Sequence, residues 1–418
     1  MGAPSWVCEV PCGERKMAQR TEEIQEAPIQ RIDVHTDTRE ILANARQQAL
    51  ERNYQDYVIF DIDSHHVETV HWHEVCEYIE DPVIRSQAVT SQKASPYGLI
   101  GDRGLSYQDV GGRIPHDTAR NETVEETDVH RDVVLTRRAM ESIGIDYMVV
   151  FPTPMLSLGT HPQLHMEVLL GRAHNRWMVE NLLKADNRIK SMLYLPISDP
   201  VASLKVIEDF GDEPGVIGFM VTSVRNKALH ENQYMKVYAA LEERGLPLAF
   251  HGGYYWHEPA MALFNQFVGM HCVAFVLWNL VHLVNWVLNG LPERFPKLKV
   301  MWIESGISWI PFIMQRLDNE YLLRSSEAPA LKRLPSEYIR EMFFSSQPME
   351  RNNLEALELT MKMMKAETQL LYASDWPHQD FDLPSTIFDL PFLSDTAKRN
   401  ILGETALKLF NLDRPNGK

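Results

Sequence analysis

The sequence predicts an α/β fold, a (β/α)8 TIM-like barrel with an N-terminal arm and an inserted loop region. Three observations lead to this prediction. Eight short apolar runs alternate with segments of helical periodicity, which is the pattern of a parallel sheet whose crossovers are helices. The chain has 418 residues, a length at which such barrels fold as one unit. Its 44% hydrophobic and 23% charged residues are typical of a globular protein with a large core, and they exclude disorder and collagen.

Residues 1–50 are expected to form an arm outside the barrel, because they are polar and contain only short apolar groups. One helix is expected in this arm, over about 38–52. The barrel is expected over 51–412, with its first strand at 57–63, a β-rich run that ends in polar residues. Residues 77–122 are rich in Gly, Pro, Ser and Gln, which predicts an inserted excursion that covers a site.

After the excursion, helix and buried strand alternate to the end of the barrel. The predicted helices cover 125–142, 164–185, 201–210, 232–244, 267–288, 307–323, 337–340 and 352–365. The predicted strands cover 145–151, 191–197, 216–221, 247–251, 298–304, 342–346 and 369–375. Residues 413–418 remain as a short tail. With the run at 57–63 these make eight strands, the number that a closed parallel barrel of this kind requires.

The charge and the cysteine usage exclude several kinds of partner and location. The chain has 41 Lys and Arg against 57 Asp and Glu, and the net charge of -16 repels nucleic-acid phosphates and anionic lipid. We therefore expect a small-molecule substrate, no nucleic-acid partner and no membrane partner. The four cysteines are too scattered for a disulfide framework, and the N-terminus lacks the apolar run of a secretory signal. A reducing, cytoplasmic location is expected.

One uncharged segment, 259–292, is long enough to span a membrane as a helix at 267–288. The polar residues of that helix fall within one narrow arc: His271, His282, Asn285 and Asn289. Several Asn and His on one helix are costly in lipid, so a soluble helix with one polar stripe is predicted. Its apolar faces and the long arm both indicate subunit contact, and we expect a homo- or hetero-oligomer with related barrel chains.

Polar residues end several of the predicted strands. They are Asp63 and His65 at the first strand, His251 at the fifth, Glu304 at the sixth and Asp375 at the eighth. The carboxyl ends of barrel strands converge on one face, so these side chains are candidate site residues. Asp63 and His65 alternate and point to the same side, while Asp61 joins them or lies one layer deeper. Each alone is more often a helix cap or a surface group, but together they predict a bound cation.

The remaining histidines near these strands are expected to have packing roles. His66 points away from the side that His65 faces. His71 and His73 are expected to be solvated or packed against loops. His161, His165 and His174 follow the second strand, where core or surface packing is expected more than substrate contact.

Motifs in four separate parts of the chain occur in a fixed order. They are DIDSHHVE at 61–68, FHGG at 250–253, PERFP at 292–296 followed by IESG at 303–306 and WIP at 309–311, and ASDWPH at 373–378. In these motifs the chain resembles the amidohydrolase-related proteins, the branch called amidohydrolase 2, over about 57–412. That branch contains non-oxidative decarboxylases and hydrolases on metal-dependent TIM barrels. The resemblance implies metal ligation by Asp63, His65, His251 and Asp375.

The chain departs from the better-known members of this family in two places. The resemblance to the decarboxylases would call for a catalytic His at the end of the sixth strand, where this chain has Glu304. Binuclear relatives bridge their metals with a carboxylated Lys after the fourth strand, where 221–223 contains none, so Glu68 is a candidate bridge. The predicted ligands are then Asp63, His65, Glu68, His251, Asp375 and His378, with Glu304 as a further candidate. Such a set suits one or two divalent ions, with Fe or Mn favoured and Zn not excluded.

Two chemistries and one non-enzymatic role remain open. The first hypothesis is O2-dependent hydroxylation of a small polar acid or amino acid, because the chain is similar to dinuclear non-haem iron monooxygenases of the 2-aminoisobutyrate hydroxylase type. Glu304 would then be a ligand or a proton carrier. The alternative is metal-assisted hydrolysis or non-oxidative decarboxylation of a small carboxylate, with Asp375 as general base. A supporting barrel subunit of a hetero-oligomer is the third hypothesis. In each enzyme, four aromatic residues are expected to wall the substrate pocket: Tyr254, Tyr255, Trp256 and Trp376.

Overall fold

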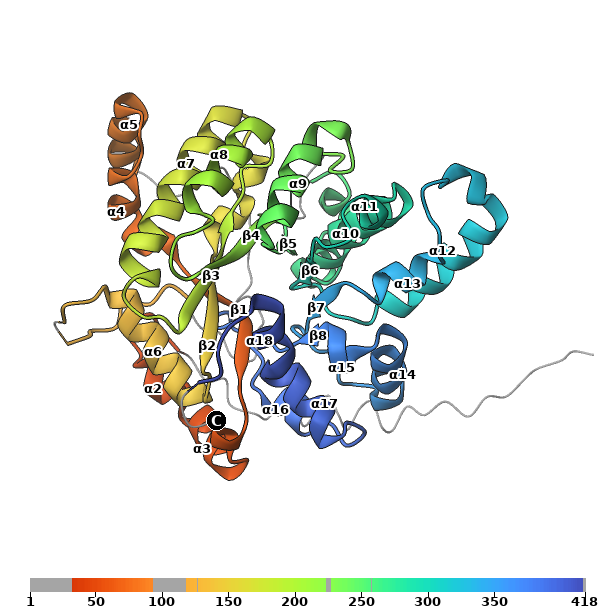
Figure 1. Ribbon diagram of the computed structural model, residues 1–418. Helices are drawn as coiled ribbons and strands as arrows, with labels where there is room; N and C mark the ends of the chain where they lie inside the picture. Colours follow the sequence, from red (N-terminus) through yellow and green to blue (C-terminus); the bar gives the residue numbers. More distant parts are fainter. Residues whose placement is uncertain (1–31, 93–117, 126, 223–226, 257, 416–418) are drawn as a thin grey trace, which may run out of the picture.

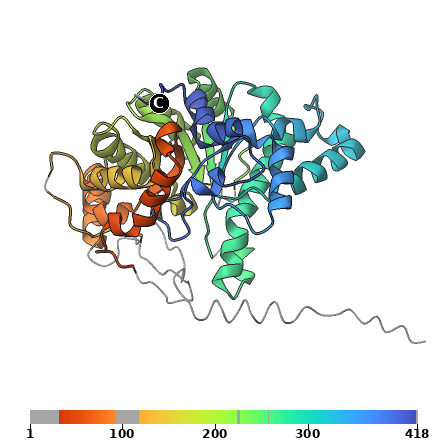
Figure 2. The same cartoon turned by 90° about the horizontal axis from the view of Figure 1, so that it is seen from below.

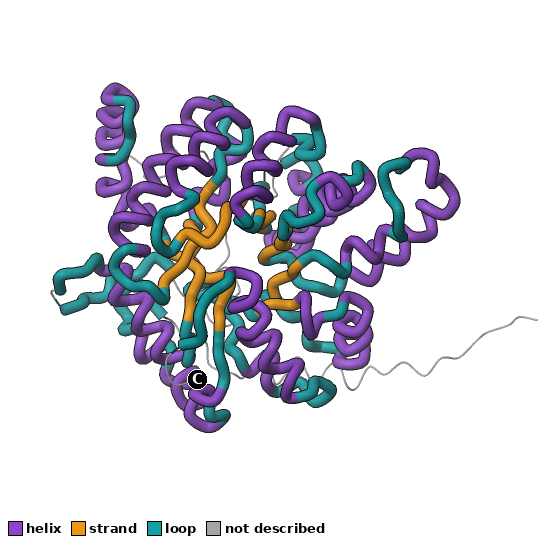
Figure 3. Tube along the Cα trace, viewed as in Figure 1, coloured by secondary structure: helices purple, strands orange, loops and turns teal. Residues whose placement is uncertain are grey.

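The structure is a computed structural model that describes residues 32–92, 118–125, 127–222, 227–256 and 258–415, and it confirms the predicted barrel. Eight parallel strands neighbour one another in chain order, and helices surround them (Figure 1, Figure 3). The described residues do not include most of the predicted arm, with Cys8 and Cys12, or residues 93–117 of the predicted excursion. The cytoplasmic location stays a prediction.

The strands are short, and their order in the sheet is their order in the chain. They are β1 (Phe60–His66), β2 (Tyr147–Pro152), β3 (Ile189–Tyr194), β4 (Val216–Thr222), β5 (Leu248–His251), β6 (Val300–Ile303), β7 (Phe343–Ser345) and β8 (Leu370–Leu371). The helices between them are α6 (Arg131–Ile143), α7 (Leu164–Met178), α8 (Pro200–Phe210), α9 (Met235–Arg244), α10 (Phe267–Leu288), α11 (Leu291–Arg294), α12 (Ile310–Arg324), α13 (Pro335–Ile339), α14 (Leu354–Met364) and α15 (Ala366–Gln369).

Short helices flank the barrel at both ends of the chain. Before β1 lie α2 (Thr38–Ile41) and α3 (Ala43–Glu51), which together cover the helix predicted for the arm. Between β1 and β2 lie α4 (Trp72–Glu77) and α5 (Pro82–Gln92), and after β8 lie α16 (Ser385–Phe388), α17 (Asp395–Arg399) and α18 (Thr405–Phe410).

The first and last strands differ clearly from their predicted bounds, and β3 begins two residues and ends three residues earlier than predicted. β1 begins and ends three residues later than 57–63, so that Ser64, His65 and His66 lie inside the strand. β8 has only two residues, and the chain after it continues beside β1. The Asp375 amide donates to the Asp63 carbonyl at 2.7 Å, and the His65 amide donates to the Trp376 carbonyl at 2.6 Å. These bonds close the barrel, and they place the two segments that carry most of the predicted ligands side by side.

α10 is packed on the barrel along part of its length and extends beyond it at its N-terminal end (Figure 2, green). Asn279 and His282 are buried, and the Asn279 amide donates to the Ile303 carbonyl at 3.1 Å, whereas Asn289 is exposed. The single predicted polar arc is therefore only partly correct. By length and composition alone, α10 could cross a membrane. Val268 on its projecting end is 72% exposed, and subunit contact there stays a prediction.

Gly252 allows β5 and β6 to meet at the mouth of the barrel. Its amide donates to the Ile303 carbonyl at 2.8 Å, and a Cβ at this position would lie 2.3 Å from the Glu304 carbonyl oxygen. Both contacts are backbone contacts, so neither neighbour can move aside as a flexible side chain would. A side chain here would separate the two strand ends that carry His251 and Glu304.

We expect Gly252→Ala to lower the free energy of unfolding by about 2 kcal/mol or more, because overpacking against backbone costs about 1–3 kcal/mol. Gly245→Ala is the matched control. Gly245 has φ +66°, and no atom lies within 4 Å of the position that a Cβ would take, so only the conformational cost of about 1 kcal/mol applies. Urea unfolding followed by circular dichroism measures both, and an equal loss in the two variants would contradict the steric argument.

Candidate metal centre

Four predicted ligands from three parts of the barrel meet at its mouth. Asp63 and His65 alternate on β1, and their side chains are completely buried. His251 ends β5, and Asp375 follows β8; both are also buried. The shared direction of alternate strand residues and the convergence of strand ends explain why these side chains meet.

The ligand atoms of these residues are in contact with one another. His65 Nε2 lies 3.3 Å from Asp63 Oδ1 and 3.2 Å from Asp375 Oδ1, and His251 Nε2 lies 3.2 Å from the same Asp63 oxygen. Two groups of three possible ligands result, in each of which the ligand atoms lie within 4.8 Å of one another. The groups are Asp63, His65 and His251, and His65, Asp375 and His378. They share His65.

The hydrogen bonds of the two imidazoles on their other side fix the ring tautomers. His65 Nδ1 lies 3.0 Å from the Pro152 carbonyl oxygen, and His251 Nδ1 lies 2.8 Å from the Gly252 carbonyl oxygen. A carbonyl only accepts, so each Nδ1 is the donor, and a neutral ring presents the lone pair of Nε2 to the carboxylates. This outer support is the arrangement that usually holds a metal-binding histidine.

In the cluster, the Nε2 lone pairs of the two imidazoles therefore face carboxylate oxygens, and both kinds of atom are hydrogen-bond acceptors. Among the described residues, His65 Nε2 and Asp63 Oδ2 are buried without a hydrogen-bond partner. Buried acceptors without donors are strongly unfavourable, and a cation at their centre would satisfy them all. Without one, a proton takes its place: burial lowers the pKa of His65, but hydrogen bonds to Asp375 and Asp63 outweigh burial and raise it well above its ordinary value. The residues present thus fit a divalent metal.

Asp61 lies one layer deeper than these groups. Its carboxylate accepts hydrogen bonds from the Ser374 amide at 2.8 Å, the Ser374 hydroxyl at 2.5 Å and the Asp63 amide at 3.1 Å. Asp61 thus ties β1 to the segment after β8 and holds Asp63 in place. Of the two positions left open for it, the structure shows the deeper one.

Glu68 is not brought into either group of possible ligands. Its two carboxylate oxygens accept hydrogen bonds from the amides of Thr153, at 3.0 Å, and Met155. These amides begin the 3₁₀ helix Pro154–Thr160, where the first donors have no partner within the helix. A bridging role for Glu68 stays a prediction: each of its carboxylate oxygens already accepts one backbone hydrogen bond, and the structure does not bring it into either group of possible ligands.

Glu304 and Asp375 have the same unusual backbone conformation. Both lie in the left-handed region, with φ 55° for Glu304 and 62° for Asp375, although neither is a glycine. Such strain is found mostly where a side chain is held for function. The Glu304 amide donates to the Ser345 hydroxyl at 2.9 Å, and its Oε2 lies 3.4 Å from His251 Nδ1.

The pKa shifts of the two carboxyl groups have opposite directions. Burial, together with the charges of Asp375 and Asp63, raises the pKa of Glu304 well above its ordinary value. Burial also raises the pKa of Asp375, but His378 and His65 outweigh it, and the net shift is downward. These shifts favour the neutral form of Glu304 and the ionised form of Asp375.

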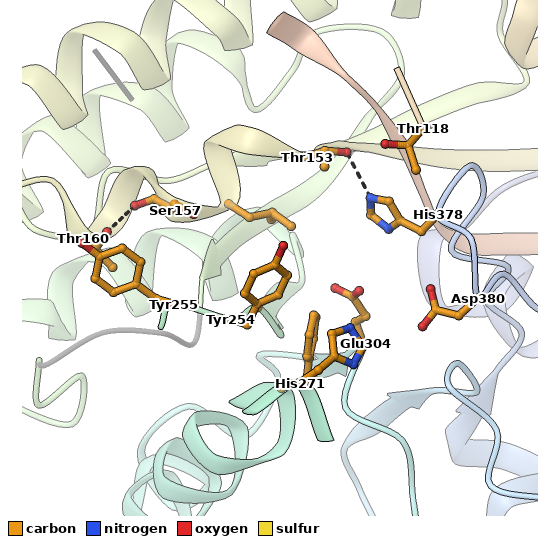
Figure 4. A pocket seen from close by; sticks show the side chains of 13 residues that line it. Thr118, Thr153, Ser157, Thr160, Tyr254, Tyr255, His271, Glu304, His378 and Asp380 are labelled. Carbon is orange, nitrogen blue, oxygen red and sulfur yellow. Dashed lines mark hydrogen bonds between the residues drawn. The ribbon is translucent and has the colours of Figure 1, made fainter. Parts of the chain in front are cut away.

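An open cavity of about 130 Å³ lies over the cluster (Figure 4). The Glu304 carboxyl group and the rings of Tyr254 and His378 face the same space. The lining residues are Thr118, Thr153, Leu156, Ser157, Thr160, Gly253, Tyr254, Tyr255, His271, Phe275, Glu304, His378 and Asp380. No lysine or arginine is among these described lining residues.

Two of the four predicted pocket aromatics line this cavity, and two do not. Tyr254 and Tyr255 line it. Trp256 packs instead with Met261, Met270 and Ala274 in a small apolar cluster. Trp376 lines a smaller neighbouring cavity of about 50 Å³. Nearness in the sequence to His251 or Asp375 therefore did not ensure a place in the cavity.

Thr153, His271 and Asp380 are among the lining residues that were not predicted from the sequence. Thr153 directly follows β2, and the rule that strand ends carry site residues would have found it. Its hydroxyl lies 3.3 Å from His378 Nε2. His271 on α10 was assigned to a polar stripe, and Asp380 lies in a loop without any local signal.

Comparisons with known proteins agree with this geometry. The sequence profile of a family described as amidohydrolase matches residues 128–412. This range contains His251, Glu304 and Asp375, and it begins after β1. No curated protein matches the chain.

Solved structures share the fold at low sequence identity. A dihydroxybenzoic acid decarboxylase from Polaromonas sp., with bound manganese and 2-nitroresorcinol, is 17% identical with a TM-score of 0.58 over 86% of this chain and 98% of that chain. A 5-carboxyvanillate decarboxylase from Novosphingobium aromaticivorans, also with manganese, is 19% identical with a TM-score of 0.61 over 86% and 97%. An amidohydrolase from Mycobacterium avium subsp. paratuberculosis is 18% identical with a TM-score of 0.61 over 85% and 99%.

We expect His251→Ala and Asp375→Ala each to reduce manganese bound per chain by about tenfold or more, because each change leaves the other acceptors without a complete ligand set. Elemental analysis after loading and gel filtration measures the bound metal. His165→Ala, a change at an exposed histidine of α7, is the control and should retain the wild-type content. Full occupancy in both cluster variants would show that these residues are not ligands.

Proposed function

The chain belongs to the amidohydrolase family, and from this premise we propose that it is a metal-dependent enzyme that decarboxylates a small carboxylate substrate without oxygen. The observation that carries the proposal is the convergence of four buried acceptor groups at the barrel mouth: Asp63, His65, His251 and Asp375. A divalent ion held by these groups would act as a Lewis acid toward the substrate carboxylate. Manganese in two similar decarboxylases supports this choice of ion.

The geometry favours one ion over two in the barrel mouth. Both groups of possible ligands depend on His65 Nε2, and one nitrogen lone pair binds only one ion. The predicted bridge, Glu68, is occupied by backbone amides. The O2-dependent hydroxylation that we placed first rests on a bridged pair of ions. Two of the similar structures are decarboxylases, and we therefore prefer non-oxidative decarboxylation.

Glu304 is proposed as the proton donor. Decarboxylation replaces a bond to CO2 with a bond to hydrogen, so the site must deliver a proton to the substrate carbon. Glu304 lines the cavity, and its Oε2 is buried without a hydrogen-bond partner among the described residues. A neutral carboxyl group at this position would supply the proton that an imidazole is expected to supply in the decarboxylases of the family.

Hydrolysis is less well supported, because Asp375 is a poor general base here. A base works best when its pKa lies near the operating pH, and the pKa of Asp375 is lowered. His378 Nδ1 also lies 2.8 Å from Asp375 Oδ1, and Asp375 contacts His65 with the same oxygen. We propose that His378 holds Asp375 ionised and oriented, and that the aromatic walls of Tyr254 and Tyr255 limit the water available.

The proposed chemistry can be tested without knowing the substrate. Manganese-loaded protein is incubated with a panel of small aromatic and aliphatic carboxylic acids, while CO2 release and O2 consumption are followed together. We expect CO2 release that is independent of O2. When the reaction runs in D2O, we expect deuterium on the product carbon that carried the carboxyl group. Turnover that consumes O2 and places oxygen in the product would overturn the proposal and return hydroxylation to first place.

We expect Glu304→Gln to lower kcat by about 100-fold or more, the usual size of a lost general acid, while manganese content stays at the wild-type level. The glutamine keeps the shape of the side chain but has no transferable proton. Asp380→Asn, at another carboxyl group of the cavity wall, is the matched control and should affect KM more than kcat. If Glu304→Gln loses the metal instead, Glu304 is a ligand and its role as proton donor is wrong.

A further inference from the structure

A second cluster of metal-binding side chains lies outside the barrel mouth. His71, Glu74 and His130 meet where the 3₁₀ helix Glu68–His71 and α4 approach the start of α6. None of them lines the substrate cavity or takes part in the chemistry proposed above. From the sequence, His71 was expected to be solvated or packed against loops, but the residue is only 8% exposed.

The ligand atoms of the three residues surround a common point. His71 Nδ1 lies 3.4 Å from Glu74 Oε1, and His130 Nε2 lies 3.0 Å from Glu74 Oε2. One ligand atom from each residue lies within 4.8 Å of the other two. His71 and Glu74 are three residues apart at the start of a helix, which places them on one face, and His130 approaches from a distant part of the chain.

Further side chains hold these ligands in orientation. His71 Nε2 lies 2.9 Å from Asp132 Oδ1, so the ring donates from Nε2 and directs Nδ1 toward Glu74. The Trp177 indole donates to Glu74 Oε2 at 2.9 Å. A carboxylate behind an imidazole is the usual outer support of a zinc-bound histidine, because it fixes the tautomer and makes the free nitrogen a better ligand.

We propose that His71, Glu74 and His130 form a second divalent-metal site, of the zinc type, that joins α4 to α6. Two imidazole nitrogens and one carboxylate oxygen, with water as a fourth ligand, match the tetrahedral preference of zinc. The barrel mouth offers a larger share of carboxylates and suits manganese. The side chains of His71, Glu74 and His130 are 10%, 31% and 12% exposed, so an ion can enter from solvent while most of the site is shielded.

Metal binding has one local cost. His130 Nδ1 accepts a hydrogen bond from the Asp132 amide at 3.1 Å, which caps α6. Coordination through Nε2 requires the proton on Nδ1, so this bond is lost. Loss of a helix cap lowers the equilibrium constant for folding by roughly a factor of five to ten. Binding of zinc by several protein ligands shifts the same equilibrium by many orders of magnitude. The metal therefore outweighs the cap.

Zinc titration of the manganese-loaded protein tests the proposal. Two variants remove a ligand and keep the local structure. Glu74→Gln retains an acceptor for the Trp177 indole, and His130→Asn retains a strong helix cap. His165→Asn is the control. We expect wild type and His165→Asn to retain one more zinc per chain after gel filtration than Glu74→Gln and His130→Asn, with zinc affinity at this site at least about tenfold lower in both variants.

The comparison between variants isolates the second site. Zinc that displaces manganese from the barrel mouth does so equally in all four proteins, and circular dichroism checks that each is folded. Cobalt in place of zinc gives a second readout, because a four-coordinate site absorbs intensely in the visible range and loss of a ligand removes that band. Equal zinc content in wild type and both variants would overturn the proposal, even if the activity proposed for the barrel mouth is confirmed. Loss of that activity with an intact zinc difference would leave this site standing.

Discussion

The contact of buried acceptors at the barrel mouth is the constraint on which the rest of the site depends. His65 comes within 3.3 Å of both Asp63 and Asp375 through atoms that carry lone pairs. This arrangement is unfavourable unless positive charge lies among them. A proton on His65 can supply that charge in part, but a divalent ion supplies more and contacts every acceptor at once. The hydrogen bonds from Nδ1 of His65 and His251 to the carbonyls of Pro152 and Gly252 serve the same arrangement. They keep the Nε2 lone pairs of both rings directed at one point.

The backbone around the site is strained by this convergence. Glu304 and Asp375 take left-handed conformations directly after their strands, and Gly252 lies against the Glu304 carbonyl where no side chain fits. Asp61 stabilises the same region from beneath by accepting three hydrogen bonds that tie β1 to the segment after β8. Asp375 and all of these hydrogen bonds lie at the joint between β1 and the segment after β8, whereas Glu304 and Gly252 follow β6 and β5. The joint that closes the barrel therefore also carries three of the four proposed ligands, Asp63, His65 and Asp375.

The alternation of apolar runs and helices was sufficient to predict the eight-stranded barrel, and strand-end polarity was sufficient to find Asp63, His65, His251 and Asp375. These features are visible in sequence because burial of a parallel sheet and convergence of its ends follow from local periodicity. What the sequence could not show depended on tertiary contacts. Glu68 carries a carboxylate, as a metal ligand does, but this carboxylate accepts hydrogen bonds from the amides of a 3₁₀ helix in a different βα unit. Trp376 follows a ligand but lines another cavity. His71 is buried because α6 and α7 pack beside it and bring Asp132 and Trp177 into contact. The sequence does not show that these helices lie there.

The two clusters show how the surroundings, more than the residue types, decide what a set of imidazoles and carboxylates can do. At the barrel mouth the groups are almost completely buried and face one another lone pair to lone pair, next to a cavity large enough for a substrate. At the second cluster the side chains of Glu74 and His130 are partly exposed, and the cavity over the barrel mouth does not include them. His71 and Glu74 each have a second partner that orients them, Asp132 and Trp177. An ion in the first place would retain access to an organic molecule and to the neutral Glu304 carboxyl group. An ion in the second would contact only protein and water, and its effect would be to hold two helices together. We therefore assign the proposed catalysis to the first cluster and a stabilising role to the second.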